Sequence, residues 1–251
     1  MRERGSVAAA LSHLMARPIR LVIPGQVHHV CLQAVSGSDA FVTPRDFDLF
    51  LEALQRAAVE HRTSIHAHSL TRAQAQLMVT PKNGDDLGRM MQALARFYVA
   101  GFNRRQGRTG SLWQSRYRAA PVGGAAELLG CMRYVEQAPR RLGLTLPLAE
   151  YPWSSAGHHA GARVDAFLAA APAASSYWAL GNTPFEREAA YGVLLETSLP
   201  RSELDRVEAT TLKGWVLGSG EFIASLSSNK ILRLAARPRG RPRKMSGDLL
   251  G

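Results

Sequence analysis

The hydrophobic positions of the chain change period repeatedly between residues 27 and 137, and each period predicts one element. Residues 27–34 alternate, which predicts a strand whose apolar face carries Val30, Leu32 and Ala34. Residues 64–70 and 75–79 predict two further strands around a short turn. The turn at residues 71–73 lacks the usual Gly or Asn, but the two runs still indicate an antiparallel hairpin.

Helical spacing predicts three long helices. The first begins at Thr43-Pro44, where a capping residue precedes a proline in the first turn; its apolar stripe is Phe47, Phe50, Leu51 and Leu54. A second helix is predicted over residues 87–103, and a third over residues 125–137, just before Pro139. The order strand, helix, hairpin, helix, strand, helix is typical of an α+β fold with helices packed on an antiparallel sheet.

The pattern changes after Gly161. Residues 166–176 are rich in alanine, helical patterns follow at 184–199 and 202–213, and Thr183 with Glu186 predicts an N-terminal cap. Met15 begins a segment that is typical of a natural start. We therefore expect an N-terminal extension without a fold at residues 1–14, a main domain at 15–161, an alanine-rich linker with a small helical region at 162–228, and a disordered tail at 229–251.

The net charge points to a polyanionic partner. The 251 residues carry a formal charge of +11, and the pI is about 10.4. Seven positive charges lie near the end with no acid between them, which leaves about +4 for the rest: Lys230, Arg233, Arg237, Arg239, Arg241, Arg243 and Lys244. Electrostatically, the tail is therefore a separable part of the chain.

Residues 237–244 alternate arginine with proline and glycine, so the backbone stays extended. An extended cationic ribbon fits the narrow minor groove of A·T-rich DNA, where the negative potential is strongest. The segment is AT-hook-like, and Arg237, Arg239, Arg241, Arg243 and Lys244 are its candidate DNA contacts. The alternative interpretation is a solvated basic tail.

The sequence does not indicate a metal-binding, membrane-spanning or secreted protein. Cys31 and Cys131 lie in apolar surroundings without metal-type spacing, which predicts buried free thiols in a reducing compartment. Charges interrupt every apolar run well before the roughly 18 residues that a membrane span needs. The N-terminus lacks a continuous apolar core before a cleavage site. We expect a cytoplasmic, nucleoid-associated protein.

Six ordered blocks resemble the REP-associated tyrosine transposases, which are single-tyrosine HUH transposases. These blocks are MARPIR (15–20), PGQVHHV (24–30), FNRR (102–105), GSLWQSRY (110–117), RYV (133–135) and YPWSS (151–155). The resemblance covers residues 15–161 and extends to residues 217–222 and the basic tail. It implies a ferredoxin-like or RRM-like HUH transposase core with a helical C-terminal extension.

The resemblance also implies a chemistry. Members of this family cut and join single-stranded DNA at palindromic repeats through a 5′-phosphotyrosine link, and Tyr134 matches the nucleophile. A divalent cation, Mg²⁺ or Mn²⁺, is held by two histidines and by a polar residue one helical turn after the tyrosine. Such an ion polarises the scissile phosphate and orients it for attack.

This sequence departs from the family where the cation would bind. Gln74 and Gln76 replace the two histidines, and Ala138 stands where an amide is expected. A neutral amide is a weak ligand for a hard dication. Nothing in the sequence would then lower the Tyr134 pKa from about 10, which is typical of a free tyrosine. We therefore predict that the catalytic role of Tyr134 is vestigial.

A displaced metal site stays open as an alternative. His66 and His68 share one strand face by spacing, and the predicted hairpin places His68 near Gln76. Together with Glu136 these side chains would form a relocated site. The competing interpretation makes His66 a packed sheet residue and His68 a chance polar substitution. We assign no chemical role to two pairs of adjacent histidines, His28-His29 and His158-His159.

The sequence retains residue types suited to DNA contacts, although it lacks the expected metal ligands. Cations and aromatic residues are interleaved in a basic loop and its continuation, comprising Arg104, Arg105, Arg108, Trp113, Arg116, Tyr117 and Arg118. This mixture suits phosphate contacts and base stacking on single strands or hairpins. The alternative is that Trp113 and Tyr117 are packing residues and the arginines are solvated.

Three functions remain for the sequence. The first is a DNA-binding protein of the transposase family with impaired catalysis, which recognises single-stranded or hairpin repeats and A·T-rich duplex. The second is an active single-tyrosine nuclease with a displaced metal site, and the third is a non-catalytic interaction protein. The oligomeric state, monomer or homodimer, stays open.

Overall fold

The computed structural model describes residues 20–144 and 147–227, and a five-stranded sheet organises them. The strand order is β2-β3-β1-β4-β5. The strands are β1 (Val27–Gln33), β2 (Thr63–Thr71), β3 (Gln74–Pro81), β4 (Arg118–Gly123) and β5 (Leu217–Gly218). The first four pair antiparallel, and β5 runs parallel to β4. The α+β fold with an antiparallel sheet is thus confirmed.

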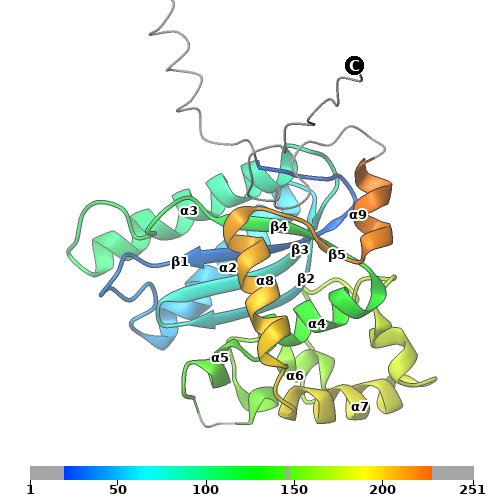
Figure 1. Ribbon diagram of the computed structural model, residues 1–251. Helices are drawn as coiled ribbons and strands as arrows, with labels where there is room; N and C mark the ends of the chain where they lie inside the picture. The colour runs from blue at the N-terminus through cyan, green and yellow to red at the C-terminus, as the bar shows by residue number, and fades with distance from the viewer. Residues whose placement is uncertain (1–19, 145–146, 228–251) are drawn as a thin grey trace, which may run out of the picture.

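Helices α2 (Pro44–Glu60) and α3 (Asp86–Arg105) cover one face of the sheet, behind it in Figure 1. Phe50 and Leu54 of α2, with Leu94 of α3, pack there on the apolar side of β1. α2 begins at the expected cap, where the carboxylate of Asp46 accepts a 2.9 Å hydrogen bond from the Thr43 N–H. This larger core fixes the strands, and their opposite face is left for the site.

The second face carries helices α4 (Ala125–Glu136) and α8 (Arg201–Lys213), and α8 crosses in front of the sheet in Figure 1. The shorter elements around them are α5 (Ala138–Arg141), η1 (Leu148–Glu150), α6 (Ala156–His159), η2 (Ser176–Leu180), α7 (Pro184–Glu196) and α9 (Gly220–Ser227). The predicted cap of α7 is confirmed, because Glu186 N–H donates to the Thr183 hydroxyl at 3.2 Å.

The helical region after residue 161 shares its core with the sheet. Tyr191 and Leu195 of α7 and Val207 of α8 belong to the same hydrophobic cluster as Val122 of β4 and Val135 of α4. Leu217 of β5 adds to it. Residues 162–227 therefore contribute both a strand and part of the core to the structure around the sheet.

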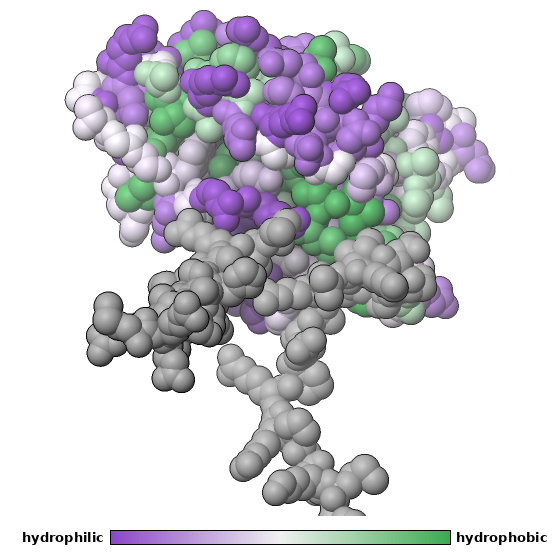
Figure 2. Space-filling view, turned by 90° about the horizontal axis from the view of Figure 1, so that it is seen from above, coloured by the Kyte–Doolittle hydropathy of each residue, from purple (hydrophilic) through white to green (hydrophobic). Residues whose placement is uncertain are grey.

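The surface seen from above in Figure 2 is mainly hydrophilic, with a hydrophobic area near its middle. Within residues 20–144 and 147–227, every helix is too short or too polar to cross a bilayer. The tail residues Arg237, Arg239, Arg241, Arg243 and Lys244, the N-terminal extension and most of the MARPIR block lie outside the described residues.

Candidate functional site

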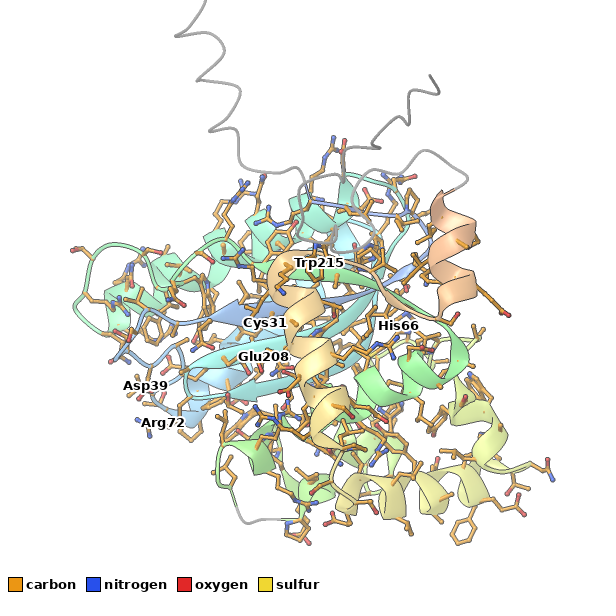
Figure 3. The ribbon with its side chains drawn as sticks, in the orientation of Figure 1. Cys31, Asp39, His66, Arg72, Glu208 and Trp215 are labelled. Carbon is orange, nitrogen blue, oxygen red and sulfur yellow. The ribbon has the colours of Figure 1, made fainter. Side chains whose placement is uncertain are left out.

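A cleft of about 440 Å³ lies on the second face of the sheet, between α4 and α8. Strand β1 supplies its polar side to this cleft, since His29, Cys31 and Gln33 alternate with the core residues Val30 and Leu32. The other lining residues are Gln74, Gln76, Gln114, Ser115, Arg116, Arg118, Tyr134, Glu208, Thr211 and Leu212. Figure 3 shows Cys31 on the sheet and Glu208 on α8, while His66 lies apart from both.

Tyr134 of α4 forms one wall of the cleft. Its ring meets His29 edge-on at a centroid distance of 5.5 Å, and the guanidinium carbon of Arg141 lies 4.0 Å from the ring centroid. Burial raises the pKa of Tyr134 to about 12, although the positive charge of Arg141 opposes the rise. The phenol is therefore protonated, and a weak nucleophile, at neutral pH.

Gln74 and Gln76 belong to a chain of hydrogen bonds along the cleft floor. The Gln76 amide nitrogen donates to the Gln74 oxygen, and the Gln74 nitrogen donates to Gln33 Oε1 at 3.1 Å. At the other end, Gln76 Oε1 lies 3.2 Å from His29 Nε2, whose Nδ1 lies 2.7 Å from the Thr211 hydroxyl. Since an amide oxygen only accepts, His29 Nε2 is the donor and its Nδ1 accepts from Thr211. Burial lowers the His29 pKa to about 4, which keeps this ring neutral.

The residues at the predicted metal position do not fit a divalent cation. Both glutamine oxygens accept hydrogen bonds from neighbouring side chains, and the third position, Ala138, offers no donor atom. Within the described ranges, His, Cys, Asp and Glu side chains also form no cluster of three that could hold a metal ion. The side chains on the floor of the cleft hydrogen-bond one another as a network of amides.

Restoring histidine tests this interpretation of the floor. We expect Gln74→His combined with Gln76→His to raise Mn²⁺ affinity about tenfold or more, because two imidazoles on one strand face would replace amides that bind each other. Isothermal titration with Mn²⁺ measures this gain. Gln114→His, from a loop that also lines the cleft, is the control and should gain less. Equal affinities in both variants would contradict the assignment.

His66 and His68 do not join Gln76. The strand register places Leu77 opposite His68 and Ser69 opposite Gln76. The expectation that His68 lies near Gln76 was therefore wrong, because the true pairing is shifted by one residue. A bulge between Ile65 and Ala67 disrupts the register at His66. His66 instead contacts the Ala170 carbonyl at 2.7 Å and the Thr80 hydroxyl at 2.8 Å, as a packed sheet residue does.

Glu136 is also held elsewhere. Its carboxylate accepts hydrogen bonds from the Ser155 hydroxyl, from His159 Nδ1 at 2.6 Å and from the Tyr191 hydroxyl at 2.6 Å. Burial alone would raise the Glu136 pKa, but the charge of His159 and these hydrogen bonds lower it below its usual value. The four side chains of the displaced metal site therefore do not converge.

The predicted DNA-contacting arginines separate into two groups. Arg116 and Arg118 line the cleft, and both are exposed. Arg104 is exposed in the last turn of α3. Arg105 pairs at 2.8 Å with the buried carboxylate of Asp46, which joins α3 to the start of α2. Arg108 donates to the Ser111 carbonyl within its own loop at 3.1 Å.

The predicted stacking aromatics are packing residues instead. Trp113 is buried against Phe41 and Phe50, at centroid distances of 6.3 and 6.2 Å. Arg20 covers the ring of Tyr117 with its guanidinium carbon 4.0 Å from the centroid, and donates to the Tyr117 carbonyl. The Trp113 ring is therefore closed to a base, and the half-buried Tyr117 ring carries Arg20 against it.

Sequence reasoning missed several cleft residues. His29 received no chemistry, although its place on the polar side of a strand next to Cys31 and Gln33 was a usable signal. Thr211 and Glu208 come from α8, some 180 residues away from β1, and no pattern in the sequence links them to it. Arg141, which lies against the Tyr134 ring although it does not line the cleft, was likewise not singled out, because it follows another arginine at the end of α5.

Comparison with family models gives no match, and no curated protein matches this sequence. Among solved structures, the chain is similar to a REP-associated tyrosine transposase bound to a REP hairpin. The TM-score is 0.50 and the identity 14%, over 63% of this chain and 92% of that one. At this identity the similarity shows the fold, and it agrees with the family that the sequence motifs resemble.

Proposed function

We propose that this protein binds the backbone of single-stranded or hairpin DNA in the cleft beside Tyr134, as a transposase relative whose strand-cutting chemistry is impaired. One observation carries the proposal: the cleft brings Tyr134, Arg116 and Arg118 around a polar floor. Arginines at the rim suit phosphate oxygens, and amides and hydroxyls suit sugar and base edges. The similar fold of a transposase bound to a REP hairpin supports the same ligand class.

The proposal that the strand-cutting chemistry is impaired rests on the residues at the floor of the cleft and on Tyr134. Gln74 and Gln76 bond to each other and to their neighbours, so they do not offer free ligands to a cation. Tyr134 keeps its proton at neutral pH because burial raises its pKa to about 12. Neither a metal-polarised phosphate nor an ionised tyrosine is then supplied by these residues.

The AT-hook-like tail is proposed as a second contact, on A·T-rich duplex beside the bound hairpin. Its five cations would add sequence-independent affinity that salt weakens. Association with the nucleoid would follow from both contacts.

Fluorescence anisotropy with a labelled hairpin that carries a single-stranded extension tests the proposal. We expect Arg116→Ser with Arg118→Ser to lower affinity about tenfold or more and to flatten the slope of log affinity against log salt by roughly 0.7 per lost phosphate contact. The control is Arg201→Ser, which removes one positive charge at the start of α8, away from the cleft lining. The Arg201 side chain is 84% exposed, and this variant should bind like the wild type. Wild-type protein that does not retain this DNA at physiological salt would point to the interaction-protein alternative.

The same DNA, incubated with Mn²⁺ and analysed under denaturing conditions, tests the impaired chemistry. We expect no covalent protein–DNA adduct. Adducts that disappear in Tyr134→Phe would overturn the impairment and support the active nuclease.

A further inference from the structure

Arg141 is a cation next to Tyr134 that no predicted role has used. It is the last residue of α5, and its guanidinium carbon lies 4.0 Å from the centroid of the Tyr134 ring. Its Nη1 is buried and has no hydrogen-bond partner among the described residues. A buried donor without a partner is costly, and guanidinium donors match phosphate oxygens in a planar fork.

The surroundings of Arg141 keep its charge available. Burial lowers its pKa below the usual value, but a guanidinium in a protein stays protonated at neutral pH. Across the part of the chain that the structure describes, Arg141 takes part in no salt bridge. Glu208, the acidic residue whose charge acts on both Arg141 and Tyr134, is itself exposed on α8.

The charge also acts at the amide floor. After burial itself and the hydrogen bond that His29 donates to Gln76, Arg141 is the charged group that acts on the pKa of His29, and it lowers this pKa. A fixed positive charge therefore stands beside Tyr134 and acts on the His29 ring. That ring contacts Gln76, one of the two positions at which the family resemblance implied a metal ligand. Gln74 and Gln76 stand in place of the histidines that would ligate such an ion, and the Arg141 guanidinium supplies a positive charge beside Tyr134.

We propose that Arg141 is a phosphate-binding residue that holds the DNA backbone at Tyr134 through its unpartnered guanidinium donor, without a divalent cation. This inference rests on the proposed DNA-binding function and names the group that makes it metal-independent. A phosphodiester oxygen at Nη1 would satisfy the orphaned donor and place the backbone over the Tyr134 edge of the cleft.

The first test needs no variant. Hairpin DNA with a single-stranded extension is titrated onto the wild-type protein in Mn²⁺ and in excess EDTA at equal ionic strength. The proposal expects the same affinity in both, within about twofold, because the charge is covalently part of the chain. Affinity that EDTA lowers about tenfold or more would overturn it, whereas no binding in either condition would instead overturn the proposed function.

The second test removes the charge. Arg141→Met should lower affinity for the same hairpin about tenfold and reduce the salt slope by about 0.7, the value for one single-strand phosphate. Arg201→Met loses the same charge outside the cleft and should bind like the wild type. Arg141→Lys keeps the charge but not the planar fork, so it should keep the wild-type salt slope while losing part of the affinity.

These slopes separate binding from folding. A purely structural role of Arg141 would lower the melting temperature and the active fraction without changing the salt slope of the remaining folded protein. Wild-type affinity and slope in Arg141→Met, or a slope that Arg141→Lys loses as well, would contradict the assignment.

Discussion

Lowering the pH from 7 to 5 is expected to reduce the free energy of unfolding by about 6 kcal/mol, because three buried histidines resist protonation. Burial lowers the pKa of His28 and of His29 to about 4 and that of His68 to about 3. In the unfolded chain these side chains titrate near 6.5, so at pH 5 the unfolded state binds more protons. Each histidine then contributes about 2 kcal/mol of lost stability.

The folded and unfolded pKa values of the histidines set the pH range in which this stability is lost. The stabilising contribution of neutral histidine is fully present above about pH 6.5 and is lost as the pH falls toward 4. His66 and His158, whose pKa values are also lowered by burial, act in the same direction. Urea unfolding at several pH values measures the slope, which should reach about 4 kcal/mol per pH unit between pH 6 and 5.

His68→Leu is the matched test, because His68 is fully buried and neither ring nitrogen has a partner among the described residues. The variant should be at least as stable as the wild type at pH 7, since it removes a polar ring that burial leaves unsatisfied. Its pH slope should fall to about two thirds of the wild-type value, because two of the three histidines remain. A slope that stays unchanged would show that His68 is solvated or protonated in the folded protein.

Glu136→Leu is expected to cost about 4 kcal/mol of stability, the second large effect in this structure. The Glu136 carboxylate is fully buried and accepts from three residues of two other segments: Ser155 and His159 of α6 with its cap, and Tyr191 of α7. Leucine fills the space but leaves two hydroxyls and an imidazole without their acceptor. Because Glu136 ends α4 two residues after Tyr134, the same change should loosen the wall of the cleft.

Tyr191→Phe provides the comparison for Glu136→Leu. It removes one donor while keeping the ring, and should cost only about 1–2 kcal/mol. Thermal and urea unfolding of the two single variants and of the double variant measure the coupling, which should exceed about 1 kcal/mol. A cost below 1 kcal/mol for Glu136→Leu would mean that the carboxylate does not organise this network.

Acid should also weaken the hydrogen-bond network around Glu136, at a lower pH than the one at which the buried histidines take up protons. The Glu136 pKa lies below its unfolded value near 4.3, so its contribution is present above about pH 4 and is lost as the pH falls through the folded pKa. Histidine and carboxylate effects therefore occupy separate pH windows, and Glu136→Leu should alter the lower one.

The sequence by itself determined the elements of the α+β core and the polar side of the site. Periodicity gave β1, the β2–β3 hairpin and the helices α2, α3 and α4 close to their observed bounds, because each buries one regular apolar face. Alternation along β1 and β3 also placed Gln74 and Gln76 on one face, and the structure puts both in the cleft with Tyr134. These are local consequences of a period of two or 3.6 residues.

Only the tertiary structure decided what these residues touch. The register of β2 on β3, which the two-residue turn between Thr71 and Gln74 sets, pairs His68 with Leu77 and not with Gln76, and a bulge then displaces His66. Sequence spacing records neither feature. Trp113 and Tyr117 have the residue types of stacking platforms, but Trp113 is buried against Phe41 and the half-buried Tyr117 ring is covered by Arg20. Thr211 and Glu208 reach the cleft from α8, because the core that positions α8 is built from non-local contacts. Arg141 meets the Tyr134 ring only because the chain turns back after α4.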